Sequence, residues 1–117
     1  MIDPDTTIIT PTRNRPEQLS LVIDRINAQT IKPSLWVIAD DSDQPLPDSL
    51  LYKSQVPIKY LHEPRKYNKS TQYNTARALQ AADTEKVIFI DDDDYYPPQY
   101  IEKFLQKLYN DNTLVGH

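Results

Sequence analysis

Apolar residues fall into two kinds of segment along this chain: short continuous runs, and longer stretches in which they recur every three or four positions. The short runs are rich in β-branched residues and end at turn-forming residues, which is typical of strands. These predicted strands cover residues 7–10, 35–39, 58–62 and 86–90. Pro11 is expected to stop the first of them. The second, LWVIA, has no polar position, as in a parallel sheet covered on both faces.

The longer stretches predict amphipathic helices over residues 15–29, 70–82 and 97–110. Pro16 suits the first turn of the first helix, and Asn14 is a candidate cap before it. Residues 44–57 contain several prolines and are interpreted as one connecting loop. Because strands and helices alternate, the sequence predicts an α/β fold: a mostly parallel sheet with helices on both faces.

Length and composition narrow the class of protein. A chain of 117 residues has the size of one domain, so residues 1–117 are expected to form a single unit. The absence of cysteine excludes disulfides and thiolate metal sites and fits a reducing compartment. The apolar runs are too short to span a bilayer, and the first residues do not resemble a signal peptide. We therefore expect a cytoplasmic protein with no membrane span.

The acidic excess of the chain is concentrated in one place. The net charge is −4, from 17 acidic and 13 basic residues, and the four aspartates at 91–94 account for the whole difference. This distribution argues against nucleic acid as a partner, because nucleic acid selects a basic face. Adjacent carboxylates oppose one another's ionisation, so we expect this run to bind a divalent cation. A solvated acidic cap on the following helix is the structural alternative.

A polar cluster follows each predicted strand. In open parallel sheets, ligands bind beyond the carboxyl ends of the strands, so folding would gather these clusters at one edge. Acids that hold a cation beside bases that hold an anion indicate a site for a metal-bound phosphate or diphosphate. The clusters are residues 11–15 (PTRNR), 40–43 (DDSD), 62–69 (HEPRKYNK) and 91–94 (DDDD).

Four segments together resemble the successive motifs of family 2 glycosyltransferases with the GT-A fold. They are TIITPTRNRPEQLSLVIDRINAQT, WVIADDSDQ, YNTARALQAADTE and VIFIDDDDYYPP, in the family's order and spacing. The resemblance implies a Rossmann-like half that binds a nucleotide-diphosphate sugar, and transfer of that sugar to an acceptor. It also implies that the acceptor half and the general base lie beyond residue 117. An apparently truncated chain of this kind is expected to self-associate through an exposed sheet edge.

The resemblance assigns the metal to the acidic run. Asp91 and Asp93 correspond to an Asp-x-Asp motif that would hold Mn²⁺ or Mg²⁺ against the donor diphosphate, with Asp93 as the direct ligand and Asp91 also near the ribose. Asp92 is included among the donor-binding residues, although alternation along a strand would turn it away from its two neighbours. Asp94 is expected to support the start of the next helix.

The same resemblance places the nucleobase between the first two clusters. Asp40 and Asp41 stand where the family recognises the base and ribose, and Asp41 is the better candidate. A carboxylate can accept the imide N–H of uracil or two N–H groups of guanine, and we favour a UDP-sugar. An Asx turn leaving the strand is the structural alternative. Pro11, Thr12 and Arg13 stand where the family packs the base, and Arg13 would stack on it or reach a phosphate.

Basic and aromatic residues complete the candidate set. Lys69 lies nearest a predicted helix start, where anions are favoured, and is the main candidate for contacting the diphosphate. Arg65 and Lys66 are further candidates, with solvated surface side chains as the alternative. Tyr95 and Tyr96 would line a sugar pocket or pack against the core.

Two other functions remain open from the residues alone. The chain could be a catalytically silent nucleotide-binding module whose partner chain supplies the acceptor side. It could also be a nucleotidyltransferase on a related fold, although such enzymes usually carry glycine in the first loop, and PTRNRPE has none.

Overall fold

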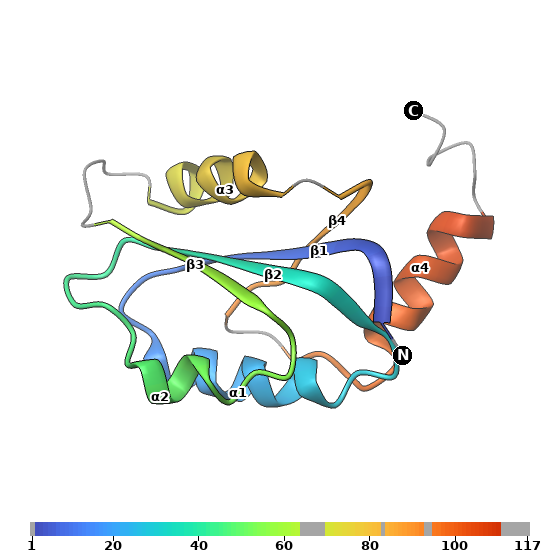
Figure 1. Cartoon of the computed structure of the whole chain (residues 1–117), viewed down its shortest axis with the longest axis horizontal. Helices are drawn as coiled ribbons and strands as arrows, with labels where there is room; N and C mark the ends of the chain where they lie inside the picture. Colours follow the sequence, from blue (N-terminus) through green and yellow to red (C-terminus); the bar gives the residue numbers. More distant parts are fainter. Residues whose placement is uncertain (1, 64–69, 83, 93–94, 111–117) are drawn as a thin grey trace.

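A computed structural model describes residues 2–63, 70–82, 84–92 and 95–110 of the chain. Its centre is a four-stranded sheet in the order β3-β2-β1-β4, and each neighbouring pair of strands is parallel (Figure 1). The strands are β1 (Ile2–Thr12), β2 (Lys32–Asp40), β3 (Ile58–His62) and β4 (Lys86–Phe89). All four predicted strands are therefore present.

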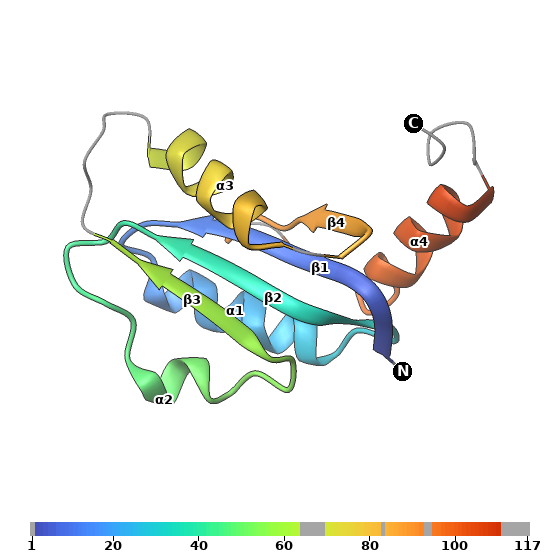
Figure 2. The same ribbon diagram turned by 45° about the horizontal axis from the view of Figure 1, so that its top comes forward.

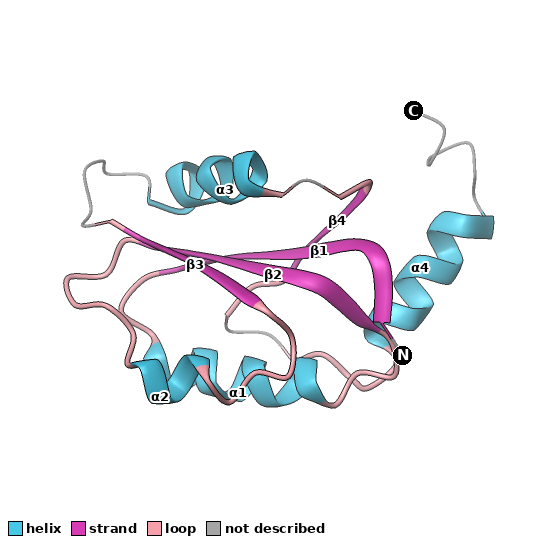
Figure 3. Ribbon diagram, viewed as in Figure 1, coloured by secondary structure: helices cyan, strands magenta, loops and turns pink. Residues whose placement is uncertain are grey.

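Helices cover both faces of this sheet, as predicted. Figure 1 shows α1 and α2 beneath the sheet and α3 above it, and the turned view in Figure 2 shows α3 lying along β1 and β2. Figure 3 shows the alternation of strand and helix that defines the α/β class. The helices are α1 (Pro16–Asn27), α2 (Asp48–Leu51), α3 (Ser70–Ala81) and α4 (Tyr100–Asn110). Within the described ranges, no helix is long and apolar enough to cross a membrane.

The first strand continues past Pro11, where the sequence predicted that it would stop. The carbonyl of Ile9 accepts a hydrogen bond from the N–H of Ile90, so it points toward β4. Residues two apart on a strand point the same way, and the nitrogen of Pro11 therefore also faces that side. The pairing of β1 with β4 ends at Ile9 and Phe89. Proline thus interrupts no ladder hydrogen bond here, and β1 reaches Thr12.

Three smaller expectations were wrong. Residues 44–57 contain the short helix α2 rather than a continuous loop. Arg15, and not Asn14, is the N-cap residue of α1, because the helix begins at Pro16; Asn14 has a left-handed backbone with φ of 54°. Helix α4 begins at Tyr100, after the two prolines, whose carbonyls accept hydrogen bonds from the N–H groups of Thr30 and of the Gln29 side chain.

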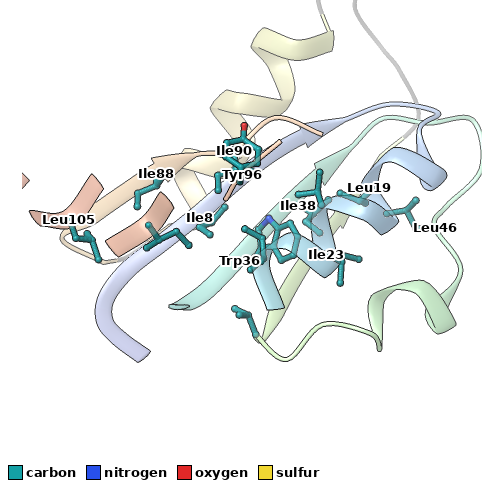
Figure 4. Packing of buried hydrophobic residues seen from close by; sticks show 14 residues of the cluster. Ile8, Leu19, Ile23, Trp36, Ile38, Leu46, Ile88, Ile90, Tyr96 and Leu105 are labelled. Carbon is teal, nitrogen blue, oxygen red and sulfur yellow. The ribbon is translucent and has the colours of Figure 1, made fainter. Parts of the chain in front are cut away.

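The core has two parts, one on each face of the sheet. On the α1 side, Trp36 packs with Ile8, Ile38 and Ile88 among the buried residues shown in Figure 4. The indole N–H of Trp36 donates to the hydroxyl of Thr10 at 2.9 Å, so its polar atom is satisfied. A smaller cluster on the α3 side contains Ile9, Val37, Ala39 and Ala78. Burial on both faces explains why 35–39 has no polar position.

Candidate functional site

The ends of three strands bring the predicted polar clusters to one edge. In the register of the sheet, Thr12 at the end of β1 lies beside Asp40 at the end of β2, and Asp40 lies beside His62 at the end of β3. Asp91 and Asp92 follow β4 on the other side of β1. The edge therefore gathers acids and bases from segments about 80 residues apart in sequence.

Asp40 is fully buried, and the protein itself uses both of its carboxylate oxygens. Oδ1 accepts hydrogen bonds from the backbone N–H of Ser42 at 2.8 Å and from the Ser42 hydroxyl. Oδ2 accepts from the hydroxyl of Tyr60 at 2.5 Å. Burial, together with this hydrogen bond to Asp40, raises the pKa of Tyr60 well above its ordinary value. A direct contact of Asp40 with a base or ribose, as predicted, would require breaking these bonds.

Asp41 is also buried, with 1% of its surface exposed, but its carboxylate lacks the hydrogen bonds that Asp40 accepts. In the described part of the chain, no hydrogen-bond donor reaches either of its carboxylate oxygens. The Arg13 guanidinium lies 3.8 Å from Oδ1, and Nη1 of the same residue donates to the Asp41 carbonyl at 2.5 Å. A buried carboxylate without hydrogen-bond donors is energetically costly. The Asp41 carboxylate can therefore accept hydrogen bonds from a ligand.

Asp92 ties the acidic run to the first loop. It is 8% exposed, and its Oδ2 accepts a hydrogen bond from the Thr12 hydroxyl at 2.7 Å. Its Oδ1 lies 3.4 Å from Nη1 of Arg15, which makes an ion pair. Asp91 is exposed, and its backbone N–H donates to the hydroxyl of Tyr96 at 2.9 Å. Asp91 and Asp92 therefore lie in different environments.

The remaining predicted residues divide into three groups. Pro11 lies at the end of β1 beside Ala39. Tyr96 is buried and packs edge-on against Tyr100, whereas Tyr95 is exposed beneath the guanidinium of Arg25. The residues outside the described ranges are Arg65, Lys66, Lys69, Asp93 and Asp94.

The donor chemistry at this edge fits a hard divalent cation. Its acidic side chains offer oxygen atoms, which Mg²⁺ and Mn²⁺ prefer, and such ions complete their shell with water and substrate phosphates. Among the described residues, no three acidic, histidine or cysteine side chains form a metal cluster. Among the described residues of the acidic run, Asp91 is the exposed carboxylate that could contact such an ion.

Sequence reasoning missed two residues of α3 that hold this edge together. Arg77 donates from Nη2 to the carbonyl of Asp40 at 3.2 Å and to the side-chain oxygen of Asn74 at 2.8 Å. The Asn74 amide donates to the carbonyl of Thr12 at 3.3 Å and is buried. Both side chains share the sheet-facing side of the helix with Ala78. Two large polar residues on the side of the helix that also carries Ala78 and Ala81 were the available signal.

The sequence of the chain matches the model of a known protein family. The family model described as glycosyl transferase family 2 matches residues 7–117. Among solved structures, the crystal structure of S. aureus TarS matches with a TM-score of 0.66 and 19% identity, over 91% of this chain and 20% of that chain. At this identity the match shows a shared fold, which confirms the expected architecture. No curated protein matches significantly.

Proposed function

Because the chain belongs to glycosyl transferase family 2, we propose that its sheet edge binds a nucleotide-diphosphate sugar and forms the donor half of a sugar-transfer site. The chain spans 20% of the length of the TarS chain that it matches. The acceptor and the general base are therefore left unassigned.

The observation that carries this proposal is the buried carboxylate of Asp41, which has no hydrogen-bond donor among the described residues. A nucleobase that offers an N–H group to this carboxylate would satisfy it. Arg13 lies beside Oδ1, which leaves Oδ2 for one donor. A single imide N–H, as in uracil, suits this arrangement better than the paired donors of guanine. This favours an imide-bearing pyrimidine over guanine, and a UDP-sugar is the donor that we propose.

The charged part of the donor would lie toward the acidic run. Members of this family generally use a divalent metal. Asp91 and Asp93 are the proposed ligands for Mn²⁺ or Mg²⁺, and Lys69 is the proposed basic contact of the diphosphate. When bound, such an ion neutralises charge on the departing nucleoside diphosphate. Asp92 contributes to this part of the site by holding Thr12 and Arg15 beside the acidic run.

Nucleotide binding by the folded chain tests the proposal. We expect UDP with Mn²⁺ to raise the melting temperature more than GDP or dTDP with Mn²⁺. At about 100 times the dissociation constant, stabilisation should be about 2.7 kcal/mol. For a domain of this size, this corresponds to a shift of roughly 4–8 °C. A folded protein that shows no shift with any of these diphosphates would contradict the proposal.

A matched pair of variants tests the role of Asp41. Asp41→Asn replaces the acceptor with an amide, and we expect UDP affinity to fall by roughly ten- to a hundredfold, the value of a hydrogen bond to a charged group. Asp43→Asn is the control. The Asp43 carboxylate also lies near Arg13, at 3.6 Å, but its side chain is 76% exposed. Equal loss in both variants, or in neither, would remove Asp41 from the base site.

A further inference from the structure

The loop after β2 contains two adjacent acids with opposite environments. Both carboxylate oxygens of Asp40 accept hydrogen bonds, from Ser42 and from Tyr60. The carboxylate of Asp41 accepts no hydrogen bond from the described residues. We infer that Tyr60, acting through Asp40 and Ser42, is a positioning residue that holds Asp41 for the base and so sets base discrimination without touching the nucleotide. This inference rests on the proposed function of the site.

The Tyr60 hydroxyl holds both ends of the loop that begins with Asp41. It donates to Oδ2 of Asp40 at 2.5 Å, before the loop, and accepts the backbone N–H of Leu46 at 2.8 Å, after it. One oxygen atom on β3 therefore fixes the separation of these two positions. The ring of Tyr60 is itself held by stacking on His62, at 6.1 Å between centroids.

Ser42 holds the residue that follows Asp41. Its N–H and hydroxyl both donate to Oδ1 of Asp40, and the same hydroxyl accepts the backbone N–H of Asn14 at 2.7 Å. Its carbonyl accepts from Nε2 of His62 at 2.9 Å, so that nitrogen carries the hydrogen. Ser42 therefore connects the first loop, the second loop and β3.

The backbone before Asp41 is held in the same way. The carbonyl of Asp40 accepts from the N–H of Glu63 at 3.0 Å and from Arg77 at 3.2 Å. The N–H of Asp41 donates to the carbonyl of Thr12 at 3.4 Å. With the backbone restrained on both sides, the direction in which the Asp41 side chain leaves the chain is fixed, and Arg13 lies beside its carboxylate. A restraint is needed because a buried carboxylate without donors would otherwise gain free energy by turning toward water.

Removing the Tyr60 hydroxyl should release this restraint. Tyr60→Phe leaves Oδ2 of Asp40 and the N–H of Leu46 without their shared partner, and the loop is then free to let Asp41 rotate into solvent. The diphosphate contacts lie on other elements and should be unaffected. The expected signature is therefore a loss of selectivity for the base N–H, and not a uniform loss of affinity.

The probe is a pair of ligands, UDP and N3-methyl-UDP, titrated in the presence of Mn²⁺. The methyl group removes the one imide donor of uracil. We expect the wild-type chain to prefer UDP by roughly ten- to a hundredfold. In Tyr60→Phe this ratio should approach one, while binding of N3-methyl-UDP stays near the wild-type value. A purely structural defect would weaken both ligands together and leave the ratio unchanged.

Two further variants complete the design. Tyr52→Phe is the control, because Tyr52 is 82% exposed, and it should keep the wild-type ratio. Ser42→Ala removes a second part of the network and decides the question if Tyr60→Phe does not fold. A wild-type chain that binds neither ligand would refute the proposed function itself. A wild-type chain that prefers UDP, with the same preference in both Tyr60→Phe and Ser42→Ala, would refute only the positioning role.

Discussion

The loops after β2 and after β4 meet at the same sheet edge but are built in different ways. Each has one buried carboxylate that the protein uses internally: Asp40 in the first loop and Asp92 in the second. The neighbouring carboxylates differ. Asp41 is buried without a hydrogen-bond donor in the described structure, whereas Asp91 is exposed.

This difference matches the two kinds of ligand chemistry that the proposed nucleotide-sugar donor would present. A neutral base is read by hydrogen bonds, which discriminate best when the protein group is dry and held in place. A diphosphate and its cation are attracted by charge, which operates at an exposed edge where the ion keeps its waters. Under the proposed function, burial would serve base selectivity at the loop after β2, and exposure would serve binding of charged groups at the loop after β4.

The largest effect on the proposed difference between the two loops is expected when one carboxylate of the loop after β4 is neutralised. Asp93→Asn replaces the proposed metal ligand with a neutral amide, and we expect it to abolish the Mn²⁺ dependence of UDP binding. The chain should stay folded, because adjacent carboxylates repel and the change relieves that repulsion. UDP titration with and without Mn²⁺ measures the effect, with Asp94→Asn as the control. Wild-type metal dependence in both variants would exclude the run as the metal site.

A smaller effect is expected when the second loop loses its support. Gln29 is 2% exposed, donates to the Pro97 carbonyl at 2.7 Å, and accepts the N–H of Ile101 at 3.0 Å. Gln29→Ala leaves the buried N–H of Ile101 unsatisfied, removes the bond to the Pro97 carbonyl, and should lower the free energy of unfolding by about 1–3 kcal/mol. Metal-dependent UDP affinity should fall, while the preference for UDP over N3-methyl-UDP persists. Urea denaturation and titration measure the two effects.

Gln18→Ala is the matched control, because Gln18 is a glutamine on α1 that is exposed. It should change neither stability nor binding appreciably. If Gln29→Ala removed the base preference and spared the metal dependence, the separation between the two loops would be wrong.

The smallest effect concerns the pH dependence of the first loop. Burial and the hydrogen bond to Asp40 raise the pKa of Tyr60, so the folded chain retains this proton at pH values where the unfolded chain loses it. The stabilisation is complete below the ordinary tyrosine pKa of about 10 and is lost as the pH rises toward the raised folded value. Urea denaturation from about pH 8 to about pH 11 should therefore show a steeper fall in stability for the wild type than for Tyr60→Phe. Equal slopes would show that Tyr60 is not restrained as described.

The elements of the fold were predictable because apolar periodicity is a local property. The strand 35–39 and the helix beginning at Pro16 were read directly from neighbouring residues, and both are present. The passage of β1 through Pro11 was not predictable, since it depends on where β4 stops pairing. The same holds for Asn14, whose left-handed backbone is accompanied by its hydrogen bonds to Ser42 and Asp43.

The sequence by itself determined the order of strands and helices, the family, and the fact that polar clusters follow the strands. It did not determine which acid of each adjacent pair is available to a ligand. Asp40 and Asp41 are the same residue type, one position apart, and only the tertiary structure brings Tyr60 to one of them. Likewise, the partner of Asp92 is Thr12, 80 residues away. Hydrogen bonding between distant segments decided the environment of each carboxylate, because burial and donors come from other strands.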